Sequence, residues 1–152
     1  RIDEDAPVLD SAEHAHTLRP IPQAVHAHGG KILLQVLHAG RYAKVPQPVG
    51  ASEIPSRINP RAPRRLSEAE IGATIEDIAR CSTLALEAGY DGVEIMGSEG
   101  YLLNQFACRR VNERTDRRGG DIHGRTRFPA SIVRAVRSCR GSRRAAPRNT
   151  PA

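Results

Sequence analysis

The sequence predicts an α/β fold that is part of a (β/α)8 TIM barrel, with about two to three βα units and an irregular C-terminal tail. Two apolar runs, 31–38 and 91–97, are typical of parallel strands, and a long helical pattern lies between them. Polar residues follow each run directly, at the position where such barrels carry their active sites. The segment "MGSEG" lacks the glycine spacing of a dinucleotide-binding turn, so a doubly wound fold is disfavoured.

The first part of the chain predicts a loop, a helix, a strand and a second loop. Residues 1–17 are acidic and polar and are expected to form a loop, and a short helix is expected over 20–28, where a glycine pair ends it. The run "KILLQVLH" (31–38) is continuous apart from one glutamine, which is typical of a strand buried on both faces. Residues 40–66 contain several prolines and no periodicity, so they predict a long loop of the kind that often carries function.

A capping pattern marks the start of the longest helix. Ser67 and Glu70 have the spacing of a capping box, so a helix should begin after Ser67 and end at Gly89. Alanines and isoleucines follow one another at helical spacing along this segment and form its apolar face. The remaining elements are expected, in chain order, to be a strand at 91–97, a short helix at 99–107, a loop at 112–127 and a helix at 127–137 with Pro129 near its start.

The length of the chain predicts one domain and only part of a barrel. The 152 residues can enclose one core, whereas a complete barrel needs about 250 residues. The chain begins with Arg1 rather than Met, which predicts a piece of a longer protein. The barrel segment is expected over residues 1–137. Residues 138–152 are basic and have no strand pattern, so they are expected to be disordered or the product of a shifted reading frame.

The charge is uneven along the chain. The net charge is +6, with −4 over residues 1–108 and +10 over residues 109–152. Such asymmetry is compatible with a basic nucleic-acid-binding protein, an alternative from a different class. The basic segment lacks interleaved aromatic residues and any known nucleic-acid motif, so this partner is disfavoured. No apolar stretch predicts a membrane span, and no signal segment opens the chain.

The cysteines and histidines predict no metal site. Cys81, Cys108 and Cys139 are far apart and include no C-x-x-C pair, so neither a disulfide framework nor a zinc site is expected. Such cysteine usage fits the reducing cytoplasm. His14 and His16, and likewise His26 and His28, form pairs two residues apart that lack a third ligand, so metal binding is not expected.

Tyr101 is the first candidate for chemistry because it follows the second strand. Phenols have a pKa near 10, so at neutral pH the hydroxyl is a proton donor. At a barrel mouth it could protonate the carbanion that forms during reduction of a C=C bond. The alternative is a ring that packs beside Leu102 and Phe106.

Gln35 and Glu99 are the other polar candidates. A buried amide within an apolar strand must find partners, and the edge of a flat heterocycle such as the flavin pyrimidine ring would supply them for Gln35. The alternative is a glutamine bonded to neighbouring backbone. Glu99 could act as a general acid or base, or form an ion pair with Arg41 or Arg110.

Several segments together resemble one family. "KILLQVLHAGRYA", "INPRAPRRLSEAEI", "EAGYDGVEIMGSEGYLLNQF", "NERTDRRGGD" and "RTRFPASIVRAVR" are similar to the FMN-containing 2,4-dienoyl-CoA reductases of the old yellow enzyme superfamily. The resemblance covers roughly residues 20–137, and the motifs agree in order and spacing. It implies an FMN-binding (β/α)8 barrel, with residues 1–137 as a partial FMN-binding segment.

The resemblance also implies roles for three residues. Gln35 would contact the pyrimidine ring of FMN, Tyr101 would donate the proton that complements a hydride from reduced FMN, and Arg110 would contact substrate. The family reaction is the NADPH-dependent reduction of a C=C bond in 2,4-dienoyl-CoA, so NADPH and an unsaturated acyl-CoA are the implied partners. The family also uses FAD and a 4Fe-4S cluster, whose binding regions are absent from this sequence.

Two positions separate the groups of this superfamily. Ordinary old yellow enzymes carry a His and an Asn or His where this chain has Met96 and Glu99, so the chain looks like the dienoyl-CoA group. An ene reductase of the old yellow enzyme type stays the alternative. Family members usually have an aromatic residue in place of Arg118. A third of a barrel leaves strand edges open, so the chain alone is expected to be inactive and able to self-associate.

Overall fold

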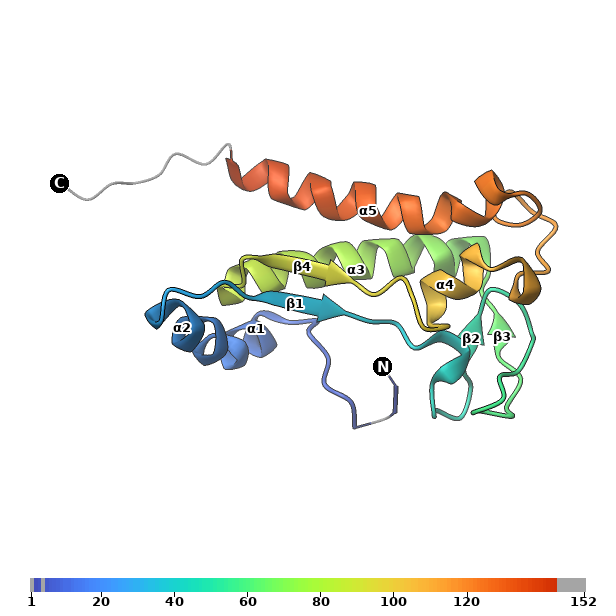
Figure 1. Ribbon diagram of the computed structural model, residues 1–152, viewed down its shortest axis with the longest axis horizontal. Coiled ribbons are helices and arrows are strands. Elements are labelled where there is room, and N and C mark those ends of the chain that lie inside the picture. The colour runs from blue at the N-terminus through green and yellow to red at the C-terminus, as the bar shows by residue number, and fades with distance from the viewer. Residues whose placement is uncertain (1, 4, 145–152) are drawn as a thin grey trace.

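The computed structural model describes residues 2–3 and 5–144 (Figure 1). Its helices and strands are, in chain order, α1 (Ala12–Leu18), α2 (Pro20–Ala27), β1 (Leu33–Val36), the 3-10 turn η1 (Gly40–Tyr42), β2 (Val49–Gly50), β3 (Arg64–Arg65), α3 (Glu68–Ala88), β4 (Gly92–Ile95), α4 (Leu102–Ala107), the 3-10 turn η2 (Arg109–Val111) and α5 (Ile122–Arg144).

Strands β1 and β4 form a parallel pair, as the alternation of strands and helices predicted. Leu33 lies opposite Gly92 and Val36 lies opposite Ile95, with α3 as the connection between the strands. Helix α5 follows β4, so the described residues contain two βα units. Strands β2 and β3 form a separate parallel pair inside the long loop. Among the described residues the strands form these two pairs and no closed barrel.

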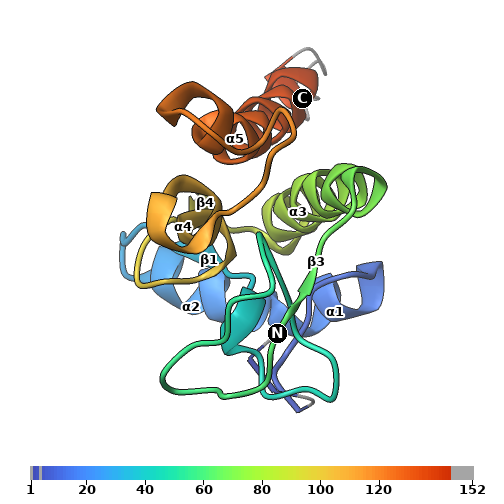
Figure 2. The same ribbon diagram turned by 90° about the vertical axis from the view of Figure 1, so that its right-hand side faces the viewer.

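Both strands point toward the same end of the molecule. In Figure 1 the arrows of β1 and β4 run toward the end that α4, β2 and β3 occupy. Seen from that end, α4 lies in front of the strand pair, α3 lies to its right and α5 lies above it (Figure 2). The loops that follow the two strands therefore meet at one edge, which is where polar side chains were expected to gather.

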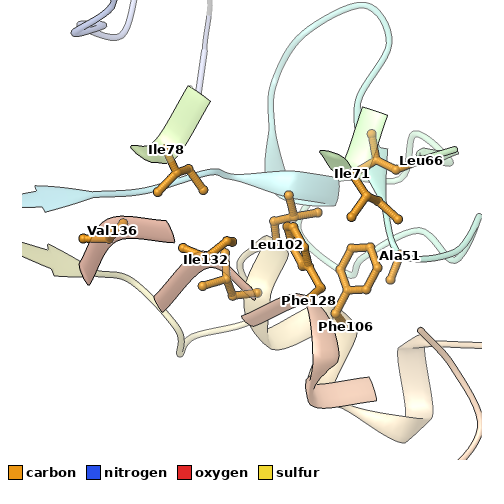
Figure 3. Packing of buried hydrophobic residues seen from close by; sticks show 10 residues of the cluster. Ala51, Leu66, Ile71, Ile78, Leu102, Phe106, Phe128, Ile132 and Val136 are labelled. Atoms are coloured by element: carbon orange, nitrogen blue, oxygen red, sulfur yellow. The ribbon is translucent and has the colours of Figure 1, made fainter. Parts of the chain in front are cut away.

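The main hydrophobic core joins α3, α4 and α5 behind this edge. Phe106 of α4 and Phe128 of α5 are fully buried, and their ring centroids lie 4.4 Å apart. Ile71 of α3 and Ile132 of α5 are also fully buried in the same cluster (Figure 3). Burying such side chains stabilises the fold by about 1.5–3 kcal/mol each. Helix α4, which follows Tyr101, is thus held in place by its side chains in the core.

The capping box predicted at the start of α3 is confirmed. The Ser67 hydroxyl accepts a hydrogen bond from the Glu70 N–H at 3.3 Å, and a Glu70 carboxylate oxygen accepts one from the Ser67 N–H at 2.8 Å. Gly89 ends the helix with φ of 106°, a left-handed conformation that favours glycine. The 21-residue helix is therefore specified at both ends by local sequence.

Strand β1 is buried on one face only, so the expectation of a strand buried on both faces was wrong. Leu34 and Val36 are half-buried against the helices, whereas Leu33 is 56% exposed and Gln35 is exposed. Glu94, opposite Gln35 on β4, is exposed as well. Among the described residues, helices pack on only one face of the β1–β4 pair. Two βα units do not close into a barrel, so no other strand covers the second face.

Two helices depart from the predicted boundaries. Helix α1 lies within the segment expected to be a loop, and the Ser11 hydroxyl caps it by accepting a hydrogen bond from the His14 N–H. Helix α5 begins at Ile122, inside the expected 112–127 loop, where an Asp121 carboxylate oxygen accepts from the Gly124 N–H at 2.8 Å. Pro129 consequently lies inside the helix rather than at its start.

The expected tail is helical in its first part. Helix α5 continues to Arg144, beyond the boundary placed at residue 137, so the expectation of an irregular chain over 138–144 was wrong. Residues 145–152 lie outside the described residues. No helix in the described part of the chain combines the length and apolar character needed to cross a membrane.

Candidate functional site

The candidate site lies where the loops after β1 and β4 meet. Because the strands are parallel, the segment 37–42 and the segment 96–101 leave the sheet side by side. The Met96 N–H donates to the Val36 carbonyl at 3.0 Å, and the Leu102 N–H donates to the His38 carbonyl at 3.0 Å. These bonds continue the pairing of the strands past their ends. Backbone hydrogen bonds therefore hold the two strand-end loops against each other.

Tyr101 stands at the junction of the second loop with α4. It is the residue before the first turn of α4 and has an extended backbone. The side chain is half-buried, and its ring meets the Tyr42 ring edge to face, with centroids 5.8 Å apart. Leu102 and Phe106, which were considered as its packing partners, belong to the buried core cluster. The Tyr101 ring thus lies at the strand-end edge, beside a second tyrosine from the other loop.

The turn before Tyr101 requires glycine at position 100. Glu99 and Gly100 both have left-handed backbones, with φ of 60° and 83°. A Cβ atom at Gly100 would overlap the hydroxyl of Tyr42. For a non-glycine residue, the conformation of Glu99 is uncommon and is a form of strain that recurs at functional sites. The glycine in "SEGY" therefore allows the loop to turn sharply against Tyr42.

Gln35 is placed on the open face of β1, not in the interior. Its side chain is exposed and forms no hydrogen bond with any of the described residues, so the alternative of an amide bonded to neighbouring backbone is not found. Both the donor and the acceptor of the amide are available on the face that turns away from the helices. Gln35 and Tyr101 belong to adjacent parallel strands and their end loops, which brings them to the same edge.

Gln105 is a site residue that the sequence interpretation missed. This residue of α4 is 1% exposed. Its amide Nε2 donates to the Gly100 carbonyl at 2.7 Å, and its Oε1 accepts from the Arg41 N–H at 3.3 Å. The signal was present, because Gln105 is an amide within the apolar segment "LLNQF", as Gln35 is within its strand.

Arg110 follows α4 in the chain. It is exposed and belongs to η2, which comes after that six-residue helix. Within the described residues, neither Arg110 nor Arg41 forms an ion pair with Glu99, which is exposed.

The arginines of the 112–121 loop are bound internally. Arg114 is 5% exposed, and its guanidinium donates to the Asp116 carboxylate and to the carbonyls of Ala51 and Leu66. Much of the basic charge in this loop is therefore neutralised or buried within the fold. This arrangement leaves the loop itself with little free basic charge.

Arg118 occupies a position where family members usually have an aromatic residue, and its side chain is paired with a residue of α3. It is buried, and its guanidinium donates to both carboxylate oxygens of Glu68 at 2.9–3.1 Å. Hydrogen bonding from Arg118, with a further contribution from Arg117, holds the pKa of the Glu68 carboxyl below its usual range. Glu68 thus accommodates a charge where the resemblance implies an apolar ring.

His38, in the first loop, is held in its neutral form. Its Nδ1 accepts a hydrogen bond from the Gly40 N–H at 3.1 Å. Burial lowers the pKa of the imidazole to about 4, although the Asp77 carboxylate acts in the opposite direction. No cluster of three or more His, Cys, Asp or Glu side chains suited to a metal ion occurs in the part of the chain that the structure describes. His38 therefore acts here as a hydrogen-bond acceptor for the loop.

The pKa of His38 predicts a pH-dependent stability. Between pH 6.5 and pH 4 the unfolded chain binds a proton at this histidine and the folded chain does not, so the free energy of unfolding should fall as the pH falls. The loss from this one group should reach about 3 kcal/mol near pH 4. Urea unfolding of the wild type and of His38→Asn at pH 7 and pH 4.5 measures it. Equal losses in the two proteins would contradict the prediction.

The sequence matches a family model over almost its whole length. Residues 1–151 match the NADH:flavin oxidoreductase / NADH oxidase family. The "Metal reductase" of Desulforamulus reducens is 42% identical over 138 residues, which are 88% of this chain and 21% of that protein. The "Putative 12-oxophytodienoate reductase-like protein 2A" of Arabidopsis thaliana is 35% identical over 158 residues, which are 97% of this chain and 59% of that protein.

The fold agrees with a solved structure of the same kind. The structure of the morphinone reductase N189A mutant in complex with tetrahydroNAD is similar to this fold, with a TM-score of 0.84 and 31% sequence identity. The match covers 90% of this chain and 43% of that chain. That enzyme is a TIM barrel of the old yellow enzyme superfamily. This chain therefore spans between 21% and 59% of the length of these three proteins.

Three observations lead to one assignment. The strands β1 and β4 are parallel and have polar residues at their ends, the fold matches a barrel enzyme with a TM-score of 0.84, and residues 1–151 match the family model. The chain belongs to the NADH:flavin oxidoreductase / NADH oxidase family, whose cofactor is FMN, and its described residues form part of that family's barrel.

Proposed function

We propose that this chain supplies part of the active site of an FMN-dependent ene reductase, which adds hydrogen across a C=C bond conjugated to a carbonyl group. The observation that carries the proposal is that Gln35 lies on β1 and Tyr101 in the loop after β4, and these two strands are adjacent and parallel, so both loops leave from the same edge. The similar proteins described above support it, because their names describe reductases of an oxo-dienoate and of morphinone.

The residues at this edge fit FMN. The Gln35 amide presents a free donor and a free acceptor on the open face of β1, which suits the alternating carbonyl and N–H groups of a pyrimidine edge. Bound FMN would supply a hydride to the substrate after its own reduction. The reductant in this proposal is a reduced nicotinamide coenzyme, in line with the tetrahydroNAD complex of morphinone reductase.

Tyr101 is the proton donor in this mechanism. As one carbon of the C=C bond receives the hydride, the electron pair of the double bond moves toward the carbon next to the carbonyl. The Tyr101 hydroxyl gives its proton to that carbon, and the tyrosinate recovers a proton from solvent. The edge-to-face contact with Tyr42 and the tight turn at Gly100 fix the direction of the ring.

A 2,4-dienoyl-CoA thioester is the second candidate substrate. Its support is the pair of residues that would face a substrate carbonyl. Met96 accepts a hydrogen bond from the Ser98 hydroxyl at 3.4 Å, and Glu99 is an exposed acid. Neither is the neutral donor that binds a small ketone in ordinary old yellow enzymes. Arg110, which is exposed, would contact the substrate in this second reading.

The two substrates can be distinguished by turnover. Protein loaded with FMN is first desalted, and its flavin absorbance per mole reports whether residues 1–152 hold the cofactor without further chain. A preparation that retains FMN is then mixed with NADH or NADPH and either a cyclic enone or a 2,4-dienoyl-CoA. Faster coenzyme oxidation with the enone is expected. Preference for the thioester would favour the second candidate, and no reduction of either compound would overturn the proposal.

The cysteines are the basis for a proposed cellular location. Cys81, Cys108 and Cys139 form no disulfide bond in the part of the chain that the structure describes. Cysteines used in this way are typical of proteins in a reducing compartment, and we place the reaction in the cytoplasm on that ground.

A further inference from the structure

The amide of Gln105 connects the two strand-end loops. Its Nε2 donates to the Gly100 carbonyl at 2.7 Å, in the loop after β4, and reaches the Ala39 carbonyl at 3.5 Å, in the loop after β1. Its Oε1 accepts from the Arg41 N–H at 3.3 Å, also in the loop after β1. With 1% exposure, the side chain has no competing contact with water. One buried amide is thus shared between the loop that carries Tyr101 and the loop that continues the strand of Gln35.

The backbone around this amide leaves it little freedom. A Cβ atom at Gly40 would lie 2.5 Å from Nε2 and 2.6 Å from Oε1, closer than real contacts allow. A Cβ atom at Gly50 would lie 3.2 Å from Oε1. Glycines at both positions let the backbone approach the amide closely, because they carry no side chain. The packing therefore fixes where Gln105 sits and which carbonyls it reaches.

The link to Tyr101 is direct. The carbonyl that Gln105 binds at 2.7 Å belongs to the peptide bond between Gly100 and Tyr101. The Gly100 N–H, on the other side of the same residue, donates to the Asn104 Oδ1 at 3.1 Å. Helix α4 therefore holds both ends of Gly100 through consecutive side chains. Any movement of the Gln105 amide would move the peptide plane from which the tyrosine ring projects.

We propose that Gln105 is a positioning residue for proton delivery: it sets the place of the Tyr101 hydroxyl relative to the β1 edge where Gln35 lies. The inference rests on the proposed function, since it concerns the same site. It predicts that loss of the Gln105 hydrogen bonds impairs protonation of the substrate and leaves reduction of the flavin intact, because the Gln35 face of β1 is untouched.

The test separates the two half-reactions of the FMN-loaded holoenzyme. Gln105→Met keeps the approximate volume and removes all three hydrogen bonds. Stopped-flow absorbance follows flavin reduction by the nicotinamide coenzyme, and then flavin reoxidation by an enone in H2O and in D2O. We expect reoxidation to slow about 10- to 100-fold, as for a group displaced by about 1 Å. We also expect a larger solvent isotope effect on reoxidation and an unchanged rate of flavin reduction.

A matched variant controls for general destabilisation. Asn59 is also a buried amide, and it donates to the carbonyls of Arg41 and Ala43, in the loop after β1. It forms no hydrogen bond with segment 96–101 in the described structure. Asn59→Leu should therefore leave the reoxidation rate and its isotope effect as in the wild type. Equal behaviour of Asn59→Leu and Gln105→Met would overturn the inference.

Two further variants allow the inference to be tested even if Gln105→Met does not retain FMN. Gln105→Leu also removes the donor to Gly100 and the acceptor for the Arg41 N–H without introducing a group that can titrate, so it should show the same selective defect if Gln105→Met fails to retain FMN. Wild-type reoxidation in Gln105→Leu would overturn the inference. Tyr101→Phe distinguishes the two roles: an unchanged rate there would overturn the role of Tyr101 as proton donor and with it this inference, whereas a slow Tyr101→Phe beside a fast Gln105→Met overturns only the role of Gln105.

Discussion

Replacing Tyr101 by phenylalanine should slow reoxidation of reduced FMN by the unsaturated substrate by about 10²- to 10⁴-fold, the usual effect of losing a general acid. The ring would stay in place, because its edge-to-face contact with Tyr42 does not need the hydroxyl. Reduction of FMN by the coenzyme should be almost unchanged, since that step needs no proton from Tyr101. Stopped-flow measurement of both half-reactions in the FMN-loaded protein tests the prediction.

Tyr42 provides the matched control for this experiment. It is a second tyrosine at the same edge, 5.8 Å from Tyr101 between ring centroids, and its hydroxyl packs against Gly100. Tyr42→Phe removes a hydroxyl of the same kind and should leave reoxidation near the wild-type rate. A Tyr101→Phe protein that is reoxidised as fast as the wild type would show that the proton comes from another group.

Replacing Phe128 by alanine should lower the free energy of unfolding by about 3–5 kcal/mol, the range for a buried phenylalanine. Phe128 is fully buried and its ring lies 4.4 Å from that of Phe106, so the truncation leaves a cavity between α4 and α5. The loss should exceed the effect of any surface change because the neighbouring helices cannot close around the space. The chain has no Trp, so urea unfolding is best followed by far-UV circular dichroism.

Val133 is the control on the same helix. It is 46% exposed, so Val133→Ala removes little buried surface and should change the free energy of unfolding by about 0.5 kcal/mol or less. Similar losses in Val133→Ala and Phe128→Ala would mean that the packing between α4 and α5 does not limit stability. That result would also weaken the case that this core holds the Tyr101 turn in place.

Elements whose signals are local could be predicted from the sequence. The capping box of Ser67 and Glu70 and the left-handed Gly89 depend on residues a few positions apart, so both ends of α3 were predicted correctly. The parallel order of β1 and β4 follows from the alternation of strands and helices. The start of α5 was not predicted, because the cap at Asp121 lies in a segment of low apolar content.

Burial was the property that the sequence interpretation placed wrongly. An apolar run predicts a strand with two covered faces only if other elements of the fold cover both. Leu33 and Gln35 are exposed because helices pack on one face of the β1–β4 pair in the described residues. The same residue pattern would be buried on both faces inside a closed barrel. Pattern alone therefore specifies a strand but not its surroundings.

The sequence by itself determined the family, through the resemblance of several motifs, and the alternation of β1, α3 and β4, because both depend on patterns along the chain. Gln35 and Tyr101 as site residues stay predictions of the same kind. Only the tertiary structure decided that Gln105 joins the loops at Gly100 and Arg41, since those contacts bridge up to 64 positions of sequence. Hydrogen bonds between distant segments form when packing brings the segments together, and no local pattern encodes that distance.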